Sequence, residues 1–321
     1  MSATEIAIHN LTSIVVLSFF LGLVGSRIKS NLQLPDAVYQ GISMYLLFGI
    51  GLKGGVKLEQ SNINELAKPL VATIALGIVI PIFAFLVLRV MTKIDELNRG
   101  AIAAHYGSTS LVTFTAAIVF LESNSVEYNG YATTLLTIME IPGLVVGIYL
   151  GSRHLQRGVS WGESIKEIVF GKTVLLMVGG LVIGALSGEQ GYAKVAPFFD
   201  DLKQGLLALF LLHLGYLAGT QFKQIKEAGA LYVLFAISFP VIAGTLGVYA
   251  GHLTGMSIGG AVLLGVLCAS ASYIAAPAAV SIAMPEASKS LPILASLGIT
   301  FPFNLIIGIP YFYWLTEQIG L

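Results

Sequence analysis

The sequence predicts an all-α membrane protein: ten transmembrane helices in two inverted five-helix repeats, with helices 4 and 9 broken and crossing at the membrane midplane. Composition, long apolar segments and two matched polar tracts predict this class. Of the 321 residues, 56% are hydrophobic and 11% are charged, against about 25% charged in soluble domains. The mean hydropathy is +0.85. The apolar segments take up most of the chain, which leaves no room for a separate soluble catalytic domain.

Charge, cysteine content and motifs exclude several function classes. The 17 Lys and Arg residues balance 17 Asp and Glu residues, so no basic surface for nucleic acid is indicated. The single cysteine, Cys268, excludes an intrachain disulfide framework and Cys-based zinc sites. No Gly-x-Ser-x-Gly or His-Glu-x-x-His motif occurs, and all four aspartates lie in or beside predicted loops. We therefore expect neither an enzyme nor a cofactor.

Ten apolar segments are long enough to cross a bilayer, whose core of about 30 Å requires about 20 residues of helix. The predicted spans cover roughly residues 11–27, 37–54, 67–91, 99–121, 131–152, 171–187, 203–220, 229–253, 258–283 and 291–315. Several are rich in glycine, which is typical of helices that pack closely in lipid.

The distribution of basic residues predicts the orientation of these spans. Loops after odd-numbered spans carry 12 basic residues and the other side carries 5. The first set is Arg27, Lys29, Arg89, Lys93, Arg99, Arg153, Arg157, Lys166, Lys172, Lys223, Lys226 and Lys289, and the second is Lys53, Lys57, Lys68, Lys194 and Lys203. The positive-inside rule then predicts that odd-numbered loops are cytoplasmic and that both termini lie outside.

The longest hydrophilic connection, residues 153–170, divides the chain into two halves and is predicted to face the cytoplasm. We expect a first repeat at 1–155, a linker at 156–170 and a second repeat at 171–321. The connection holds a short amphipathic stretch that is either part of a simple linker or a docking surface for a regulator, and both interpretations stay open.

The two halves share a pattern, and five spans per half would make the repeat inverted in the membrane. Residues 107–117 (GSTSLVTFTAA) align without gaps with residues 269–279 (ASASYIAAPAA), so that Ser-x-Ser meets Ser-x-Ser. Further matched pairs in the same order are Gly51 with Gly215, Gly55 with Gly219, Pro81 with Pro240 and Pro142 with Pro302.

The two Ser-x-Ser tracts lie within predicted spans 4 and 9, which indicates a transport site. A helix broken there exposes backbone N–H groups and the positive end of a helix dipole, which suit an anion. The preceding half-helix ends in free carbonyls that suit sodium. Alternatively, the serines only permit close packing and bond to their own backbone.

Glu140 is the clearest ionisable residue inside a predicted span, two residues before Pro142. A carboxylate in the hydrocarbon layer must be neutralised by a proton, a basic partner or a cation. No Lys or Arg is expected at that depth, so sodium is favoured and a proton stays the alternative. The candidate sodium ligands are Glu140, Thr113, Thr300 and Asn304. The Asn304 amide serves either a ligand or backbone groups freed by the nearby proline.

Five motifs carry a resemblance to the bacterial sodium-dependent bicarbonate transporters of the cyanobacterial type, over nearly the whole chain. They are YLLFGIGLKGG at 45–55, HYGSTSLVTF at 105–114, MEIPG at 139–143, ASASYIAAPAA at 269–279 and LGITFPFNLIIGIP at 297–310. The resemblance implies a moving core of spans 3–5 and 8–10, a scaffold of spans 1–2 and 6–7, an elevator motion and a homotrimer in the bacterial inner membrane. It places the substrate contacts at Ser108, Thr109, Ser110, Ser270, Ala271, Ser272 and Tyr273, with sodium close by.

The resemblance also bears on partners. The cyanobacterial members are inhibited by a small soluble PII-like protein and have a longer central cytoplasmic segment than this chain, so the regulatory partner stays open here. The expected function is a sodium-coupled symporter that imports bicarbonate. The alternatives are a secondary transporter of another small anion, such as a carboxylate, coupled to sodium or protons, and a passive anion channel.

Overall fold

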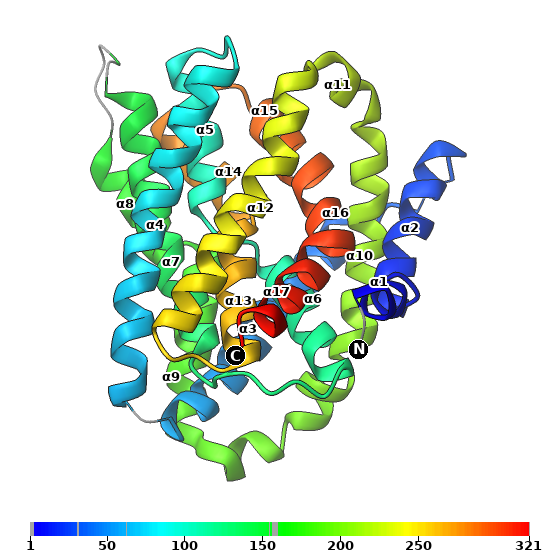
Figure 1. Cartoon of the computed structure of the whole chain (residues 1–321), viewed down its shortest axis with the longest axis vertical. Helices are drawn as coiled ribbons and strands as arrows, with labels where there is room; N and C mark the ends of the chain where they lie inside the picture. The colour runs from blue at the N-terminus through cyan, green and yellow to red at the C-terminus, as the bar shows by residue number, and fades with distance from the viewer. Residues whose placement is uncertain (1–2, 31, 62, 154, 156–159, 321) are drawn as a thin grey trace.

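Helices form all of the regular secondary structure that the computed structural model describes, at residues 3–30, 32–61, 63–153, 155 and 160–320. Figure 1 shows most of them running along the long axis of the molecule. The elements are α1 (Ala3–Leu11), α2 (Ile14–Arg27), α3 (Asp36–Glu59), α4 (Ile63–Met91), α5 (Glu96–Gly107), α6 (Leu111–Ser123), α7 (Ala132–Ser152), α8 (Trp161–Phe170), α9 (Lys172–Ala193), η1 (Pro197–Asp201), α10 (Lys203–Thr220), α11 (Phe222–Glu227), α12 (Ala230–Leu253), α13 (Ile258–Ala269), α14 (Ala275–Ala283), α15 (Ser290–Ile293), η2 (Leu294–Thr300), α16 (Phe301–Phe303), η3 (Asn304–Gly308) and α17 (Ile309–Gln318).

Seven helical stretches in the described residues are long and apolar enough to cross a membrane: Glu65–Met91, Glu96–Ser123, Ala132–Ser152, Lys172–Ala193, Pro197–Thr220, Ala230–Leu253 and Ser290–Gln318. The other three predicted spans have different properties. The first falls on α2, which has 14 residues, and the ninth on α13, which has 12 before its break. The second falls on α3, whose 24 residues include four charged side chains. The number of ten spans therefore stays a prediction.

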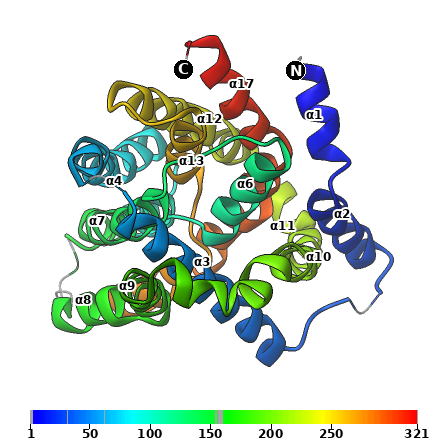
Figure 2. The same ribbon diagram turned by 90° about the horizontal axis from the view of Figure 1, so that it is seen from below.

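The stretch from α5 to α6 lies inside the bundle. All residues of its most apolar 18-residue segment are buried, which is true of no other candidate span in the described residues. Figure 2 shows α6 near the middle of the molecule, with α1 and α2 at the edge. A polar tract in this stretch is therefore kept away from lipid by the surrounding helices.

Glycines let several helix pairs approach until their backbones touch, including α12 and α13 at Gly247 and Gly251; two further groups of such contacts bear on the arrangement of the bundle. A Cβ added to Gly143 of α7 would overlap the Gly107 carbonyl of α5, and Gly147 and Gly100 continue the same α5–α7 contact. The second group joins α2 to α10 and α3 to α9; its overlaps are Gly22 with the Leu212 carbonyl and Gly55 with the Leu181 carbonyl. Close backbone packing thus ties α5 to α7, and separately α2 to α10 and α3 to α9.

Gly143→Ala is expected to destabilise the protein by about 1–3 kcal/mol, because the added methyl group overlaps α5 backbone that cannot move aside easily. The control is Gly179→Ala on α9, where a Cβ would meet nothing within 4 Å. Alanine there should be neutral or stabilise by about 0.4–1 kcal/mol, because glycine is the more flexible residue in the unfolded chain. Thermal unfolding of the two purified variants checks the difference, and equal stabilities would contradict the packing argument.

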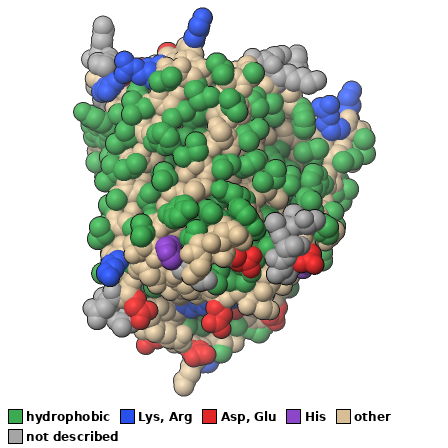
Figure 3. All heavy atoms as spheres, viewed as in Figure 1, with side chains coloured by type: hydrophobic (Ala, Val, Ile, Leu, Met, Phe, Trp, Pro, Cys, Tyr) green, Lys and Arg blue, Asp and Glu red, His purple; other side chains and the backbone are tan. Residues whose placement is uncertain are grey.

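The surface has an apolar belt between two charged ends (Figure 3). Large apolar side chains such as Ile14, Val90 and Leu186 are more than two-thirds exposed. Lys and Arg gather at the end of the molecule that is uppermost in Figure 3, whereas Asp and Glu dominate the opposite end. An exposed apolar belt between polar ends is the surface expected of a protein embedded in lipid.

Candidate functional site at the crossing of two broken helices

The helix breaks predicted from the two Ser-x-Ser tracts are present. The first separates α5 from α6 and the second separates α13 from α14. The first residue of each break has nearly the same extended backbone: Ser108 has φ −86° and ψ 155°, and Ser270 has φ −84° and ψ 160°. Both serines therefore end an apolar helix in the same way.

The two breaks cross in direct contact. The Ser110 N–H donates to Ser270 Oγ at 2.9 Å, and the Ser272 N–H donates to the His105 carbonyl at 2.7 Å. The Ser270 hydroxyl in turn donates to the Leu267 carbonyl at 2.9 Å. Backbone groups freed by one break are thus satisfied by the other, which fixes the two tracts against each other in the protein interior.

Three side-chain hydroxyls at the crossing are available to donate hydrogen bonds. Ser110 Oγ accepts from the Thr113 N–H and Thr113 Oγ1, and Ser272 Oγ accepts from the Ala276 N–H. Ser110 is the N-cap of α6, whereas Ser272 satisfies an N–H in the first turn of α14, and neither hydroxyl donates its own hydrogen within the described residues. The buried Tyr273 hydroxyl lies near Ser110 but forms no hydrogen bond of ordinary geometry within the described residues.

These hydroxyls line one cavity, which we call the crossing cavity. Its lining is Leu47, Thr109, Ser110, Leu111, Leu136, Glu140, Thr173, Met177, Ser272, Tyr273, Ile274 and Ala275. Glu140 is the only charged residue in this lining. Hydroxyl donors without a fixed positive charge suit a small, singly charged anion accompanied by a cation.

Glu140 projects from α7 and is only 2% exposed. Within the described residues it forms no ion pair or hydrogen bond, so no protein group neutralises its charge. It also lines a second cavity, the α8 cavity, together with Gln40, Glu167, Lys172 and Thr173. The carboxylate therefore lies where two cavities adjoin, within reach of a cation.

The other candidate sodium ligands lie in two places. Thr113 Oγ1 donates to Ser110 Oγ at the edge of the crossing. Thr300 Oγ1 donates to the Ala236 carbonyl at 2.7 Å and lies 2.6 Å from the Tyr106 hydroxyl. Asn304 Nδ2 donates to the Ala269 carbonyl at 2.8 Å, at the end of α13. Thr300 and Asn304 thus bond to other groups and line neither cavity that contains Glu140.

The predicted substrate contacts are likewise divided. Thr109, Ser110, Ser272 and Tyr273 line the crossing cavity, whereas Ser108, Ser270 and Ala271 are buried beside it. The Ser108 hydroxyl has no partner within the described residues, but it does not line the cavity.

Sequence reasoning missed the contribution of α3 and α9 to the cavity wall, through Leu47, Thr173 and Met177. These are ordinary apolar or small polar helix residues, and no local pattern marks them. Their place follows only from how the two helices pack beside the crossing.

The comparison with protein families agrees with this geometry. The model of the Na+-dependent bicarbonate transporter superfamily matches residues 14–317, a range that includes both breaks and Glu140. A comparison with curated proteins gives no match to this chain. Since the family model spans nearly the whole sequence, the chain belongs to the Na+-dependent bicarbonate transporter superfamily.

Proposed function

We propose that this protein is a sodium-coupled symporter that imports bicarbonate. One observation carries the proposal: free hydroxyl donors on Ser110, Ser272 and Tyr273 share a cavity with the unpaired carboxylate of Glu140. Donors of this kind bind an anion's oxygens, and the carboxylate supplies the charge that a sodium ion needs. Family membership supports bicarbonate and sodium as the two substrates.

The electrostatics of import explain why sodium accompanies the anion. An anion that enters a negative-inside cell works against about 2.3 kcal/mol for each 100 mV of membrane potential. One co-transported sodium ion cancels this charge movement and adds the energy of its own gradient. A neutral pair also lowers the penalty for taking either ion out of water, because each ion compensates the other in the cavity.

We further propose alternating access by an elevator motion within a homotrimer, with ten spans in two inverted repeats. The core would comprise α4–α7 and α12–α17, and the scaffold α2, α3, α9 and α10. The glycine contacts support this division, because they tie α5 to α7 within the core and α2 to α10 and α3 to α9 within the scaffold. The matched backbone geometry of Ser108 and Ser270 supports the repeat.

Uptake of radiolabelled bicarbonate into proteoliposomes tests the function at alkaline pH, where bicarbonate predominates over permeable CO2. An inward sodium gradient should drive saturable uptake, and replacing sodium by choline should abolish it. Unlabelled bicarbonate should compete, whereas small carboxylates should not. Competition by a carboxylate alone would indicate a different substrate, and non-saturable flux without sodium would indicate a channel.

The proposed orientation places the α9–η1 connection outside and α8 in the cytoplasm. We expect a membrane-impermeant thiol reagent to label Lys194→Cys in intact cells but to leave Ser160→Cys unlabelled, both made in a Cys268→Ala background. Lys194 and Ser160 are both exposed, so accessibility to the reagent depends on the side of the membrane. The reverse labelling pattern would invert the topology.

A further inference from the structure

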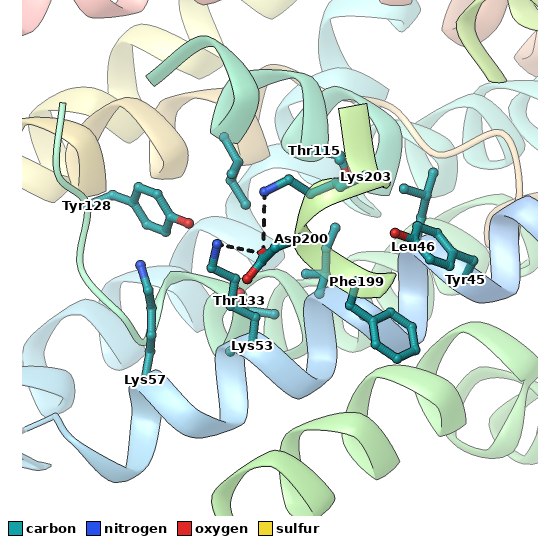
Figure 4. A pocket seen from close by; sticks show the side chains of 14 residues that line it. Tyr45, Leu46, Lys53, Lys57, Thr115, Tyr128, Thr133, Phe199, Asp200 and Lys203 are labelled. Carbon is teal, nitrogen blue, oxygen red and sulfur yellow. Dashed lines mark hydrogen bonds and ion pairs between the residues drawn. The ribbon is translucent and has the colours of Figure 1, made fainter. Parts of the chain in front are cut away.

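We propose that a second site, at the end of the molecule opposite the α8 cavity, captures a small singly charged oxyanion before it reaches the crossing cavity. The site is a cavity (Figure 4), which we call the lysine cavity. Its lining is Tyr45, Leu46, Gly49, Ile50, Lys53, Gly54, Lys57, Thr115, Ile118, Tyr128, Thr133, Phe199, Asp200 and Lys203.

The charges of the lysine cavity do not balance. Three lysines line it against a single carboxylate, that of Asp200. Lys53 Nζ lies 2.8 Å from Asp200 Oδ1 and 3.3 Å from Glu122 Oε1. Lys203 Nζ lies 2.9 Å from Glu122 Oε2. Two of the three lysines are therefore paired with carboxylates, and Lys57 is left without an ion pair within the described residues.

The remaining charge belongs to Lys57. Within the described residues its ammonium group forms no ion pair, and it lies over the Tyr128 ring at 4.0 Å from the centroid. Figure 4 shows Lys57 and Tyr128 facing each other across one side of the cavity. The ring stabilises the cation on one face only, so the ammonium keeps N–H donors for an anion. Attraction is stronger in this partly enclosed site than in bulk water.

The position of the site suits capture ahead of transport. Three cavities follow α3 in order: Gln40 lines the α8 cavity, Leu47 the crossing cavity, and Lys53 and Lys57 the lysine cavity. On α6, Ser110 at the helix start lines the crossing cavity, and Thr115 lines the lysine cavity about 7.5 Å further along the axis. An anion held by Lys57 would therefore lie about 15 Å, or nearly three helical turns, beyond Leu47 along α3.

A capture site at this end would offset the electrostatic repulsion that an approaching anion meets there. Acidic side chains dominate the end of the molecule that holds the lysine cavity, and they repel anions (Figure 3). A recessed, uncompensated lysine raises the local anion concentration and thereby the rate of productive encounter. Identification of the anion as bicarbonate rests on the proposed function, whereas capture of a small oxyanion rests on Lys57 and the cavity.

Kinetics of Lys57→Gln test the capture role. We expect the KM for external bicarbonate to rise about 3- to 10-fold while the maximal rate stays unchanged, because a steering charge acts on capture. Lys57→Arg should retain the wild-type KM. The matched control is Lys194→Gln, an exposed lysine that does not line the cavity and should not change the KM. A wild-type KM in a well-folded Lys57→Gln variant would overturn the proposal.

A binding test with nitrate is independent of bicarbonate transport. Nitrate is a planar, singly charged oxyanion that forms no carbamate with lysine. In the purified wild-type protein, sodium nitrate should slow reductive methylation of Lys57 at least about threefold relative to sodium gluconate, with no effect at Lys194. Equal methylation of Lys57 in the two salts would overturn the site. Absence of sodium-driven bicarbonate uptake by the wild type would instead refute the proposed function.

Discussion

Glu140→Gln is expected to raise the sodium concentration that half-saturates bicarbonate uptake by at least about tenfold, equivalent to about 1.4 kcal/mol. The substitution keeps the size and shape of the side chain but removes its charge. Since the carboxylate is buried and has no ion-pair partner in the described residues, a bound cation is its natural neutraliser. Loss of the charge should weaken sodium binding directly.

Comparing the effect on sodium dependence with the effect on bicarbonate binding distinguishes a sodium ligand from a protonated structural residue. At saturating sodium, the KM for bicarbonate should change much less than the half-saturating sodium concentration. Glu127→Gln is a matched control, because Glu127 is exposed and lines neither the crossing cavity nor the α8 cavity. An unchanged sodium dependence in Glu140→Gln would mean that a proton neutralises this carboxylate and that its role is structural.

The sequence was sufficient to predict the helix breaks because their causes are local. Small polar residues that cap helices interrupt apolar runs at Ser108–Ser110 and Ser270–Ser272, and the observed breaks lie there. Their contact could be anticipated only through the matched pattern of the two halves. The hydrogen bond from the Ser110 N–H to Ser270 Oγ joins residues 160 positions apart, and no local rule specifies it.

The surroundings of the candidate sodium ligands were harder to predict, because side-chain partners depend on tertiary packing. Asn304 had two open interpretations, and both stay open: its Nδ2 group donates to the Ala269 carbonyl at the end of α13, whereas its buried Oδ1 has no hydrogen-bond partner in the described residues. Thr300 bonds to α12 through the Ala236 carbonyl. Both lie beside Pro302, in a segment where π-helical turns flank α16. Sequence spacing could not reveal which carbonyls this irregular segment would meet.

The lysine cavity escaped sequence analysis for a similar reason. Lys53 and Lys57 are four residues apart and therefore lie on one face of α3. Their spacing does not reveal that Asp200 of η1 and Lys203 of α10 join them. The α8 segment shows the same limit: its amphipathic pattern was visible, but its packing against α14 through Ile168 follows from the fold.

Ser110→Ala and Ser272→Ala are each expected to raise the KM for bicarbonate about 10- to 150-fold, with a smaller effect on expression and oligomer size. In both residues the hydroxyl oxygen already serves as an acceptor for a helix N–H, while its own hydrogen is free to donate into the crossing cavity. A hydrogen bond to a charged ligand contributes about 1.5–3 kcal/mol, which corresponds to the expected range.

Loss of the helix cap should by itself lower stability, and a control variant separates this effect from the effect on bicarbonate binding. Ser257 caps α13 by accepting from the Gly260 N–H at 3.2 Å and does not line the crossing cavity. Ser110→Ala, Ser272→Ala and Ser257→Ala should all lower stability by about 1 kcal/mol, because each removes an acceptor of a helix N–H. Only the first two should raise the KM, since only Ser110 and Ser272 line the crossing cavity. A wild-type KM in both would leave these serines as structural caps and move the anion site elsewhere.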